Sequence, residues 1–303
     1  GGLRVQFTKE IQRTTVQGSL LTLKVEGLLG GHSGQDIEKE RQNADLLMAR
    51  MIQRLLKETK GQLVSFNGGT KDNAIPRECE ASLIYESDEE AAKAEELACE
   101  LAETYAEELT PAEPDFSCEI SCETNRTAEA IPQDAAKEFI CAMRLAPNGI
   151  QKRNIKMDGF VVVSLNLGVV RTEEDRIVMI FSPRSSVASL QEDTKERLNT
   201  LAETFGFTVS HSSEYPGWSF KEDSPVREIC KESYKELFGE DLKIEAIHAG
   251  LECGLFSDAI KGLDAIAIGP TIANCHTPDE YLTLDSFERF YEFLKDILSR
   301  LAK

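Results

Sequence analysis

Two apolar runs in the middle of the chain constrain its fold more than any other feature. Residues 160–170 read FVVVSLNLGVV and residues 176–184 read RIVMIFSPR, and only the polar segment RTEED separates them. Runs of this length, rich in Val and Ile and joined by a polar turn, are typical of an antiparallel hairpin. The sequence therefore predicts a sheet that contains this hairpin.

Strand-like and helix-like segments alternate on both sides of the hairpin. Strands are expected at residues 18–28, 62–69, 78–87, 115–123 and 207–211, and helices at 35–59, 85–109, 133–145 and 187–204. This alternation predicts an α+β domain made of a sheet and covering helices. Pro and Gly in SSEYPGW, residues 212–218, interrupt the pattern and mark the best domain boundary.

The last third of the chain has a different pattern, in which short apolar strands are expected to alternate with helices. Helices are expected at residues 224–238 and 284–301, and strands at 242–250 and 263–270. Short apolar strands that alternate with helices are typical of a parallel sheet covered by helices. The fold class expected for the whole chain is α/β.

The acidic balance of the chain excludes some classes of partner. The chain has 53 Asp and Glu residues and 34 Lys and Arg residues, which gives a net charge of -19. Binding to the phosphate backbone of a nucleic acid needs clustered cations instead. No run approaches the roughly 20 apolar residues of a membrane span, and the start, GGLRVQFTKE, has no signal-peptide pattern. We expect no nucleic-acid partner, no membrane partner and a cytoplasmic location.

The eight scattered cysteines form no Cys-x-x-Cys pair, and nearly all are interpreted as small buried apolar side chains in a reducing compartment.

Two of the four histidines lie at positions suited to chemistry. His32, in GLLGGHSGQDI, precedes a predicted helix, where glycines and a helix N-terminus favour developing negative charge. It could stabilise an oxyanion or merely cap the helix, and the residues alone leave both roles open. His276, after the predicted strand AIAIGP, could be a metal ligand or a polar residue at a turn. No His-x-Asp or His-Glu-x-x-His motif accompanies it.

Three further side chains are candidates for binding a substrate. Arg184 ends an apolar strand, where its guanidinium could grip a carboxylate bidentately; on the local pattern a salt bridge is the favoured alternative. Asn73, in GGTKDNAIPRE, could equally serve turn chemistry. Glu252, among the glycines of HAGLECGLF, is the most suggestive carboxylate.

Six segments in a fixed order point to a family. They are GLLGGHSGQDI, GGTKDNAIPRE, FSPRSSV, SEYPGW, HAGLECGLF and GPTIANCHTPDEYL. Together they resemble the aminoacylhistidine (Xaa-His) dipeptidases, also called cytosolic non-specific dipeptidases, of the carnosinase-like superfamily of di-zinc metallopeptidases. The resemblance runs from about residue 1 to the end of the chain.

The resemblance implies a catalytic α/β domain with a lid domain inserted into it. Residues 1–7 would end a preceding catalytic segment, residues 8–212 would form the lid, and residues 213–303 would be the C-terminal part of the catalytic domain. We expect two similar halves in the lid. In that arrangement His32 would serve the active site of its own chain.

The resemblance also implies roles for the candidate residues. The activity would be the metal-dependent hydrolysis of dipeptides, of Xaa-His type and broader, with two divalent ions, expected to be zinc. His32 would polarise the scissile carbonyl group and His276 would be the last metal ligand. Arg184 and Asn73 would hold the substrate's carboxylate and nearby backbone, and Glu252 would lie in a substrate loop.

The chain departs from the family pattern in one respect. The family's His-x-Asp motif, bridging Asp and Glu-Glu general base precede the lid and are absent from this sequence. We therefore expect the chain to supply the lid, the substrate clamp and the last metal ligand, to bind the metals incompletely, and to be inactive alone. The alternative function is a non-catalytic peptide-binding or dimerisation module, and a homodimer remains an open alternative.

Overall fold

The structure is a computed structural model that describes residues 1–155, 159–218, 220–245, 248, 250–273 and 280–302. The chain forms two compact units, residues 1–217 and residues 218–303. The division falls within the Pro- and Gly-containing segment 212–218. No helix among the described residues is long and apolar enough to cross a membrane.

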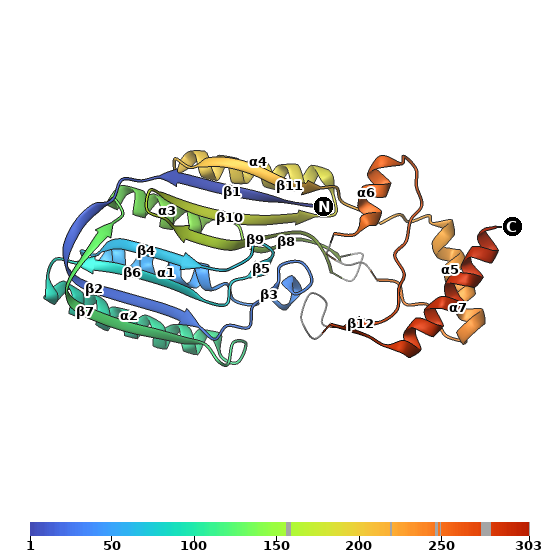
Figure 1. The fold of residues 1–303 in the computed structure, drawn as a ribbon, viewed down its shortest axis with the longest axis horizontal. Helices are drawn as coiled ribbons and strands as arrows, with labels where there is room; N and C mark the ends of the chain where they lie inside the picture. The colour runs from blue at the N-terminus through green and yellow to red at the C-terminus, as the bar shows by residue number, and fades with distance from the viewer. Residues whose placement is uncertain (156–158, 219, 246–247, 249, 274–279, 303) are drawn as a thin grey trace. The chain divides into compact units, whose positions relative to one another are not determined.

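Unit 1 is built on one antiparallel sheet with helices over one face (Figure 1). Its strands are β1 (Gly2–Glu10), β2 (Thr14–Glu26), β4 (Gln62–Gly68), β6 (Cys79–Tyr85), β7 (Ser117–Ala130), β8 (Gly149–Asn154), β9 (Phe160–Thr172), β10 (Arg176–Ser185) and β11 (Thr208–Tyr215). Its helices are α1 (Ala44–Glu58), α2 (Asp88–Leu109), α3 (Gln133–Leu145) and α4 (Ala188–Thr204). A two-residue ladder of β3 (Gly31–His32) and β5 (Ala74–Ile75) and a 3-10 helix, η1 (Ile37–Lys39), lie outside this sheet. The expected hairpin is confirmed as β9 and β10.

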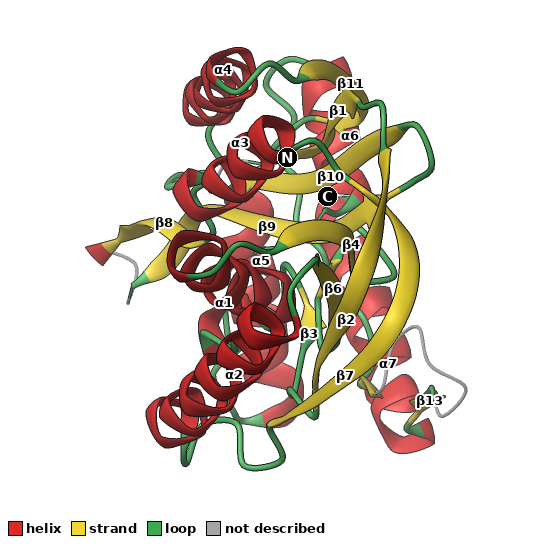
Figure 2. Ribbon diagram, turned by 90° about the vertical axis from the view of Figure 1, so that its left-hand side faces the viewer, coloured by secondary structure: helices red, strands yellow, loops and turns green. Residues whose placement is uncertain are grey.

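The core of unit 1 lies between the sheet and its four helices, which are side by side in Figure 2. The sequence of strand β2 explains why the core lies on this face of the sheet. Leu21, Leu23 and Val25 are fully buried, whereas the residues between them face the other side of the sheet. Successive side chains of a strand point to opposite faces, so this alternation turns one face towards the helices. The acidic helix α2 buries small residues such as Ala94 and Ala98 and leaves its carboxylates in solvent.

Helix α1 begins later than the sequence predicts. The sequence predicts a helix from residue 35, but α1 starts at Ala44. The Asn43 side chain accepts the backbone N–H groups of Asp45 and Leu46, which is the geometry of an N-terminal cap. The preceding 3-10 helix ends at Lys39 and is followed by Glu40, whose left-handed backbone has a φ of 49°. The cap and the left-handed residue together separate the two helical segments.

The sheet contains two groups of four strands with the same order. β2, β4, β6 and β7 are arranged β7-β2-β6-β4, and β1, β9, β10 and β11 are arranged β11-β1-β10-β9. In each group a helix follows the first strand and another follows the third, although the first group is inserted in the sequence between β1 and α3. The two groups meet at β4 and β9, where Gly68 pairs with Val170.

The first residues of the chain belong to this sheet, and not to a preceding segment as expected for residues 1–7. Strand β1 pairs with β10 on one side and β11 on the other. Leu3, Val5 and Phe7 are buried on the face that the helices cover. Strand pairing on both sides and core packing therefore fix these residues within unit 1.

A buried acidic side chain lies where the two strand groups join. Asp45, in the first turn of α1, is fully buried, and neither of its carboxylate oxygens has a hydrogen-bond partner among the described residues. A Cβ added to Gly68 would lie 1.6 Å from Asp45 Oδ1, so only glycine fits there. The nearby Arg171 guanidinium donates to the backbone carbonyls of Gly68, Gly69 and Val170.

Unit 2 is formed by α5 (Pro225–Phe238), α6 (Glu252–Ala259), α7 (Leu284–Leu301) and the short strands β12 (Ile272–Ala273) and β13 (Tyr281–Leu282). Helices α5 and α7 pack through Cys230, Phe293 and Ile297. The strands predicted at 242–250 and 263–270 are wrong for the described residues of these segments, which are irregular. A parallel strand is held by neighbouring strands, and no described segment pairs with either one. Ile244 and Ile268 are accordingly 45% and 37% exposed.

The cysteines differ from one another in burial more than the sequence suggests. Cys79 and Cys230 are buried, whereas Cys99 is exposed. The others among the described residues are half-buried: Cys118, Cys122, Cys141 and Cys253. All seven are free thiols. The expectation that nearly all would be buried is therefore wrong, because several lie on helix or strand faces that are only partly covered.

Candidate functional site

The backbone around His32 holds its imidazole in one orientation. Gly30 and Gly31 have positive φ angles of 60° and 138°, which side chains rarely allow. The His32 N–H then donates to Asp36 Oδ2 at 2.8 Å. The ring Nδ1 accepts the backbone N–H groups of Gly34 and Gln35 at 3.2 and 3.0 Å.

These contacts decide which ring nitrogen carries the proton. Because Nδ1 accepts two hydrogen bonds, the neutral His32 ring carries its proton on Nε2. The capping role considered from the sequence is thus present, although the ring caps a turn ahead of η1. Capping engages Nδ1, and a proton on Nε2 has the chemistry of a donor to a carbonyl oxygen or an oxyanion.

Asn73 is tied to His32 through the backbone. Its carbonyl accepts the Ser33 N–H at 2.9 Å, and the neighbouring Ala74 pairs with His32 in the β3–β5 ladder. The Asn73 side chain is exposed. The loop that carries Asn73 and the turn that carries His32 therefore form one hydrogen-bonded structure.

Arg184 lies near the end of β10, and one N–H group of its guanidinium has no hydrogen-bond partner among the described residues. Its Nη1 donates to the Tyr215 hydroxyl at 2.8 Å, and its buried Nε has no hydrogen-bond partner among the described residues. The strand-end salt bridge favoured by the local sequence pattern is not found with any described carboxylate. An unpaired buried donor is unfavourable, and a carboxylate is the group that a guanidinium binds best.

One face of the β9–β10 hairpin connects Arg184 to the Asn73 loop. Arg184 is directly opposite Ser164, and Ser182 is opposite Asn166. Residues two apart on a strand share a face, so Asn166 and Arg184 lie on the same side of the sheet. The Asn166 amide donates to the carbonyls of Asp72 and Ala74 at 3.3 and 2.8 Å. His32, Asn73 and Arg184 are thus linked through neighbouring elements of unit 1.

The remaining predicted residues belong to unit 2. Glu252 is the first residue of α6 and is exposed. His276 lies outside the described residues. Within the part of the chain that the structure describes, no group of three or more His, Cys, Asp or Glu side chains could hold a metal ion.

Sequence reasoning missed two residues of this arrangement. Tyr215, the partner of Arg184, lies in the segment SEYPGW, which served only as a boundary signal. Asn166 is the one amide within the apolar run FVVVSLNLGVV. That break in an apolar strand is the signal that could have identified it, because a polar group in such a strand is buried only at a cost unless it is hydrogen-bonded.

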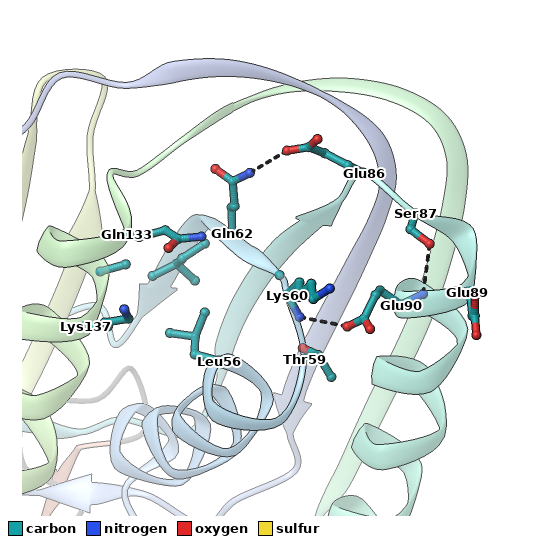
Figure 3. A pocket seen from close by; sticks show the side chains of 13 residues that line it. Leu56, Thr59, Lys60, Gln62, Glu86, Ser87, Glu89, Glu90, Gln133 and Lys137 are labelled. Atoms are coloured by element: carbon teal, nitrogen blue, oxygen red, sulfur yellow. Dashed lines mark hydrogen bonds between the residues drawn. The ribbon is translucent and has the colours of Figure 1, made fainter.

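A surface pocket lies at the start of β4, at the opposite end of this strand from Gly68 (Figure 3). It is lined by the end of α1, the start of β4 and the first turns of α2 and α3. Several of its polar groups contact each other: Glu90 accepts the Lys60 N–H at 2.9 Å, and Gln62 donates to Glu86 at 3.2 Å. None of the residues predicted to be functional lines this pocket.

Comparison with known proteins identifies the family. Residues 68–300, more than half of the chain, match the family described as Peptidase family M20/M25/M40. The chain belongs to this peptidase family. Four of the candidate residues, Asn73, Arg184, Glu252 and His276, lie within the matched stretch of the peptidase family, whereas His32 precedes it.

Two relatives place the chain more closely within the peptidase family. It is 32% identical to the cytosol non-specific dipeptidase of Escherichia coli (strain K12) over 307 residues, which cover 99% of this chain and 62% of that protein. The crystal structure of aminoacylhistidine dipeptidase from Vibrio alginolyticus superposes with a TM-score of 0.90 at 32% identity, covering 99% of this chain and 61% of that one. The chain therefore spans about three-fifths of the length of these relatives. The resemblance to the aminoacylhistidine dipeptidases and the mixed α/β fold class are confirmed.

Proposed function

We propose that this chain serves the metal-dependent hydrolysis of dipeptides, of Xaa-His type and of broader sequence. The relatives bear the names of dipeptidases. The observation that carries the proposal is the hydrogen-bonded arrangement of His32 and the Asn73 loop on the strand pair that also bears Arg184. These three groups have the chemistry that binding of a short peptide requires.

Each group has a distinct part in the proposed reaction. The His32 Nε2–H donates to the scissile carbonyl oxygen, where negative charge develops in the transition state. Arg184 binds the free carboxylate of the dipeptide, which limits the length of substrate beyond the scissile bond. Asn73 binds the substrate backbone near that carboxylate, and Glu252 contributes to a substrate loop in unit 2.

The family implies divalent metal ions, and we propose zinc, as a pair of ions. The described residues do not by themselves fit a metal site, since no cluster of His, Cys, Asp or Glu side chains is found among them. His276, the proposed ligand, lies outside those residues. The steps assigned to His32, Asn73 and Arg184 involve only these side chains and the substrate.

The proposed domain roles follow the family resemblance. Residues 8–212, together with the rest of strands β1 and β11, would act as the lid, and unit 2, within the expected range 213–303, would act as the C-terminal part of the catalytic domain. We also propose a cytoplasmic location, in keeping with the cytosolic name of the Escherichia coli relative. The expectation that the chain has no activity alone, and the open alternative of a homodimer, stay predictions.

Replacing Arg184 tests whether the substrate's carboxylate is recognised. In the metal-loaded protein that carries this chain, Arg184→Met should lower kcat/KM for a dipeptide by about 30- to 5,000-fold, mostly through KM. This corresponds to the roughly 2–5 kcal/mol expected when one partner of a desolvated charge pair is removed. Steady-state kinetics measure the effect.

A second substrate and a second variant make this test specific. The same dipeptide with an amidated C-terminus lacks the carboxylate, so wild type and Arg184→Met should hydrolyse it at similar rates. Arg176→Met, at the exposed end of the same strand and paired with Glu173, should leave both substrates unaffected. Equal losses on the acid and the amide would contradict a carboxylate-binding role for Arg184.

A further inference from the structure

Asn166 is an unusual residue for its place in the fold. It is 1% exposed and is flanked on β9 by the fully buried Leu165 and Leu167. A buried amide is unfavourable unless its polar atoms are hydrogen-bonded. Its side chain faces the opposite side of the sheet from these two leucines, which pack in the helix-covered core.

The Asn166 amide is used to bind the loop that carries Asn73. Its Nδ2 donates to the carbonyls of Asp72 and Ala74, the residues on either side of Asn73. Two carbonyls fix the orientation of the amide, because the reverse orientation would set its oxygen against both. The Asn166 Oδ1 is left buried without a hydrogen-bond partner among the described residues.

The neighbouring backbone is shaped to bring this loop against β9. A Cβ added to Gly168 would lie 2.4 Å from the Asp72 carbonyl oxygen, and one added to Gly69 would lie 1.9 Å from the Gly168 carbonyl oxygen. Both positions therefore require glycine for the close approach. The loop lies directly on the strand, within reach of the Asn166 amide.

We propose that Asn166 is a positioning residue, which sets the places of Asn73 and His32 relative to Arg184. This inference rests on the proposed function. The loop it holds bonds to Ser33 through the Asn73 carbonyl and pairs with His32 through Ala74. Arg184 belongs to the strand that pairs with β9. The β9–β10 pair is thus the common base for all three groups, and the Asn166 side chain joins residues 72–74 of the loop to it.

Amide hydrogen exchange tests this role without any catalysis. Asn166→Leu keeps the branched shape of the side chain, with larger terminal groups, but removes both hydrogen bonds to the loop. Exchange of the Ser33 N–H, bonded to the Asn73 carbonyl, and of the Ala74 N–H, bonded to the Lys71 carbonyl, should accelerate by about 10- to 100-fold. Unchanged exchange at both amides in a folded Asn166→Leu protein would overturn the proposal.

Asn148→Ala is the matched control. Asn148 also bonds to β9, but its Oδ1 accepts the Leu167 N–H at 3.0 Å, and no bond of its side chain to residues 72–74 is found. This variant should accelerate exchange at Leu167 and leave Ser33 and Ala74 within about twofold of wild type. Equal acceleration at Ser33 and Ala74 in both variants would show general loosening and would also overturn the proposal.

Kinetics then test the catalytic consequence. Asn166→Leu should lower kcat/KM for dipeptides by about 10- to 100-fold in the wild-type background, as expected for misplaced binding groups. In a background that already carries Asn73→Ala and His32→Asn the further loss should stay below about threefold, because Asn166 acts through these two groups. Additive losses would overturn the positioning role. If the metal-loaded wild-type protein that carries this chain hydrolyses no dipeptide, the proposed function fails, and exchange at Ser33 and Ala74 still decides whether Asn166 holds the loop.

Discussion

Replacement of His32 by Asn should lower kcat for dipeptides by about 10²- to 10³-fold, with a smaller change in KM. Removal of one donor to a developing oxyanion typically has an effect of this size. The His32 Nε2–H is the donor in question, since Nδ1 accepts the N–H groups of Gly34 and Gln35. The loss falls on kcat because the hydrogen bond strengthens in the transition state.

Asn is the most informative substitution because it separates the two roles of His32. Its side-chain oxygen can still accept backbone N–H groups of the following residues, as Asn does in turns, but it has no donor at the position of Nε2. The unfolding midpoint of His32→Asn should therefore stay near that of wild type while kcat falls. His211→Asn, an exchange of an exposed ring whose Nε2 lies 3.0 Å from Asn199 Oδ1, serves as the control. A His32→Asn protein with kcat within about threefold of wild type would leave only the turn-capping role.

Local features of unit 1 were predictable, whereas strand pairing was not. The β9–β10 hairpin and helix α3, found at Gln133–Leu145, follow from short-range periodicity and a polar turn. Strand β1 pairs with β10, far along the sequence, and periodicity carries no information about such partners. The same limit explains the strands expected at 242–250 and 263–270. Both segments carry apolar residues in a strand-like pattern, but the strand prediction is wrong for their described residues, because no described segment offers them a partner.

Within the candidate site, only the residues that lie in the family-like sequence segments could be predicted from the sequence. His32, Asn73 and Arg184 lie in segments that resemble a known family, so their residue types and order were informative. Asn166 lies in no such segment, and its role depends on a loop from another part of the chain. Asp45 gave no signal either, because an acidic residue in the first turn of a helix is ordinarily a solvated and favourable feature. Its burial against Gly68 is visible only in three dimensions.

Asp45→Asn should stabilise unit 1 strongly at pH 8 and only slightly, if at all, at pH 4. Burial raises the pKa of the Asp45 carboxyl from 3.8 to about 8. The Cys79 thiol and the Arg171 guanidinium oppose this shift, but a thiol is a weak donor and Arg171 directs its hydrogen bonds to backbone carbonyls. Neither satisfies a carboxylate oxygen by hydrogen-bond geometry. The other ionisable group facing this cluster is Glu80, which acts on Cys79.

The direction of the pH effect follows from the two pKa values of Asp45. Below pH 3.8 the carboxyl is protonated in both the folded and the unfolded chain, so it causes no penalty. Between pH 3.8 and about 8 the unfolded chain releases the proton while the folded chain keeps it, so the free energy of unfolding falls by about 1.4 kcal/mol per pH unit. Above about pH 8 the penalty is complete. Over roughly four pH units it reaches at most on the order of 5 kcal/mol.

Denaturant unfolding at several pH values checks this expectation. Wild type should lose stability between pH 5 and pH 8, and Asp45→Asn, which cannot ionise, should lose much less. The matched control is Glu89→Gln, which changes an exposed carboxylate in the first turn of α2. Loss of that charge near a helix N-terminus should destabilise by about 0.3–1 kcal/mol, opposite in sign to Asp45→Asn. Equal stability of Asp45→Asn and wild type at pH 8 would mean that the ionised Asp45 carboxylate is solvated or hydrogen-bonded within the core.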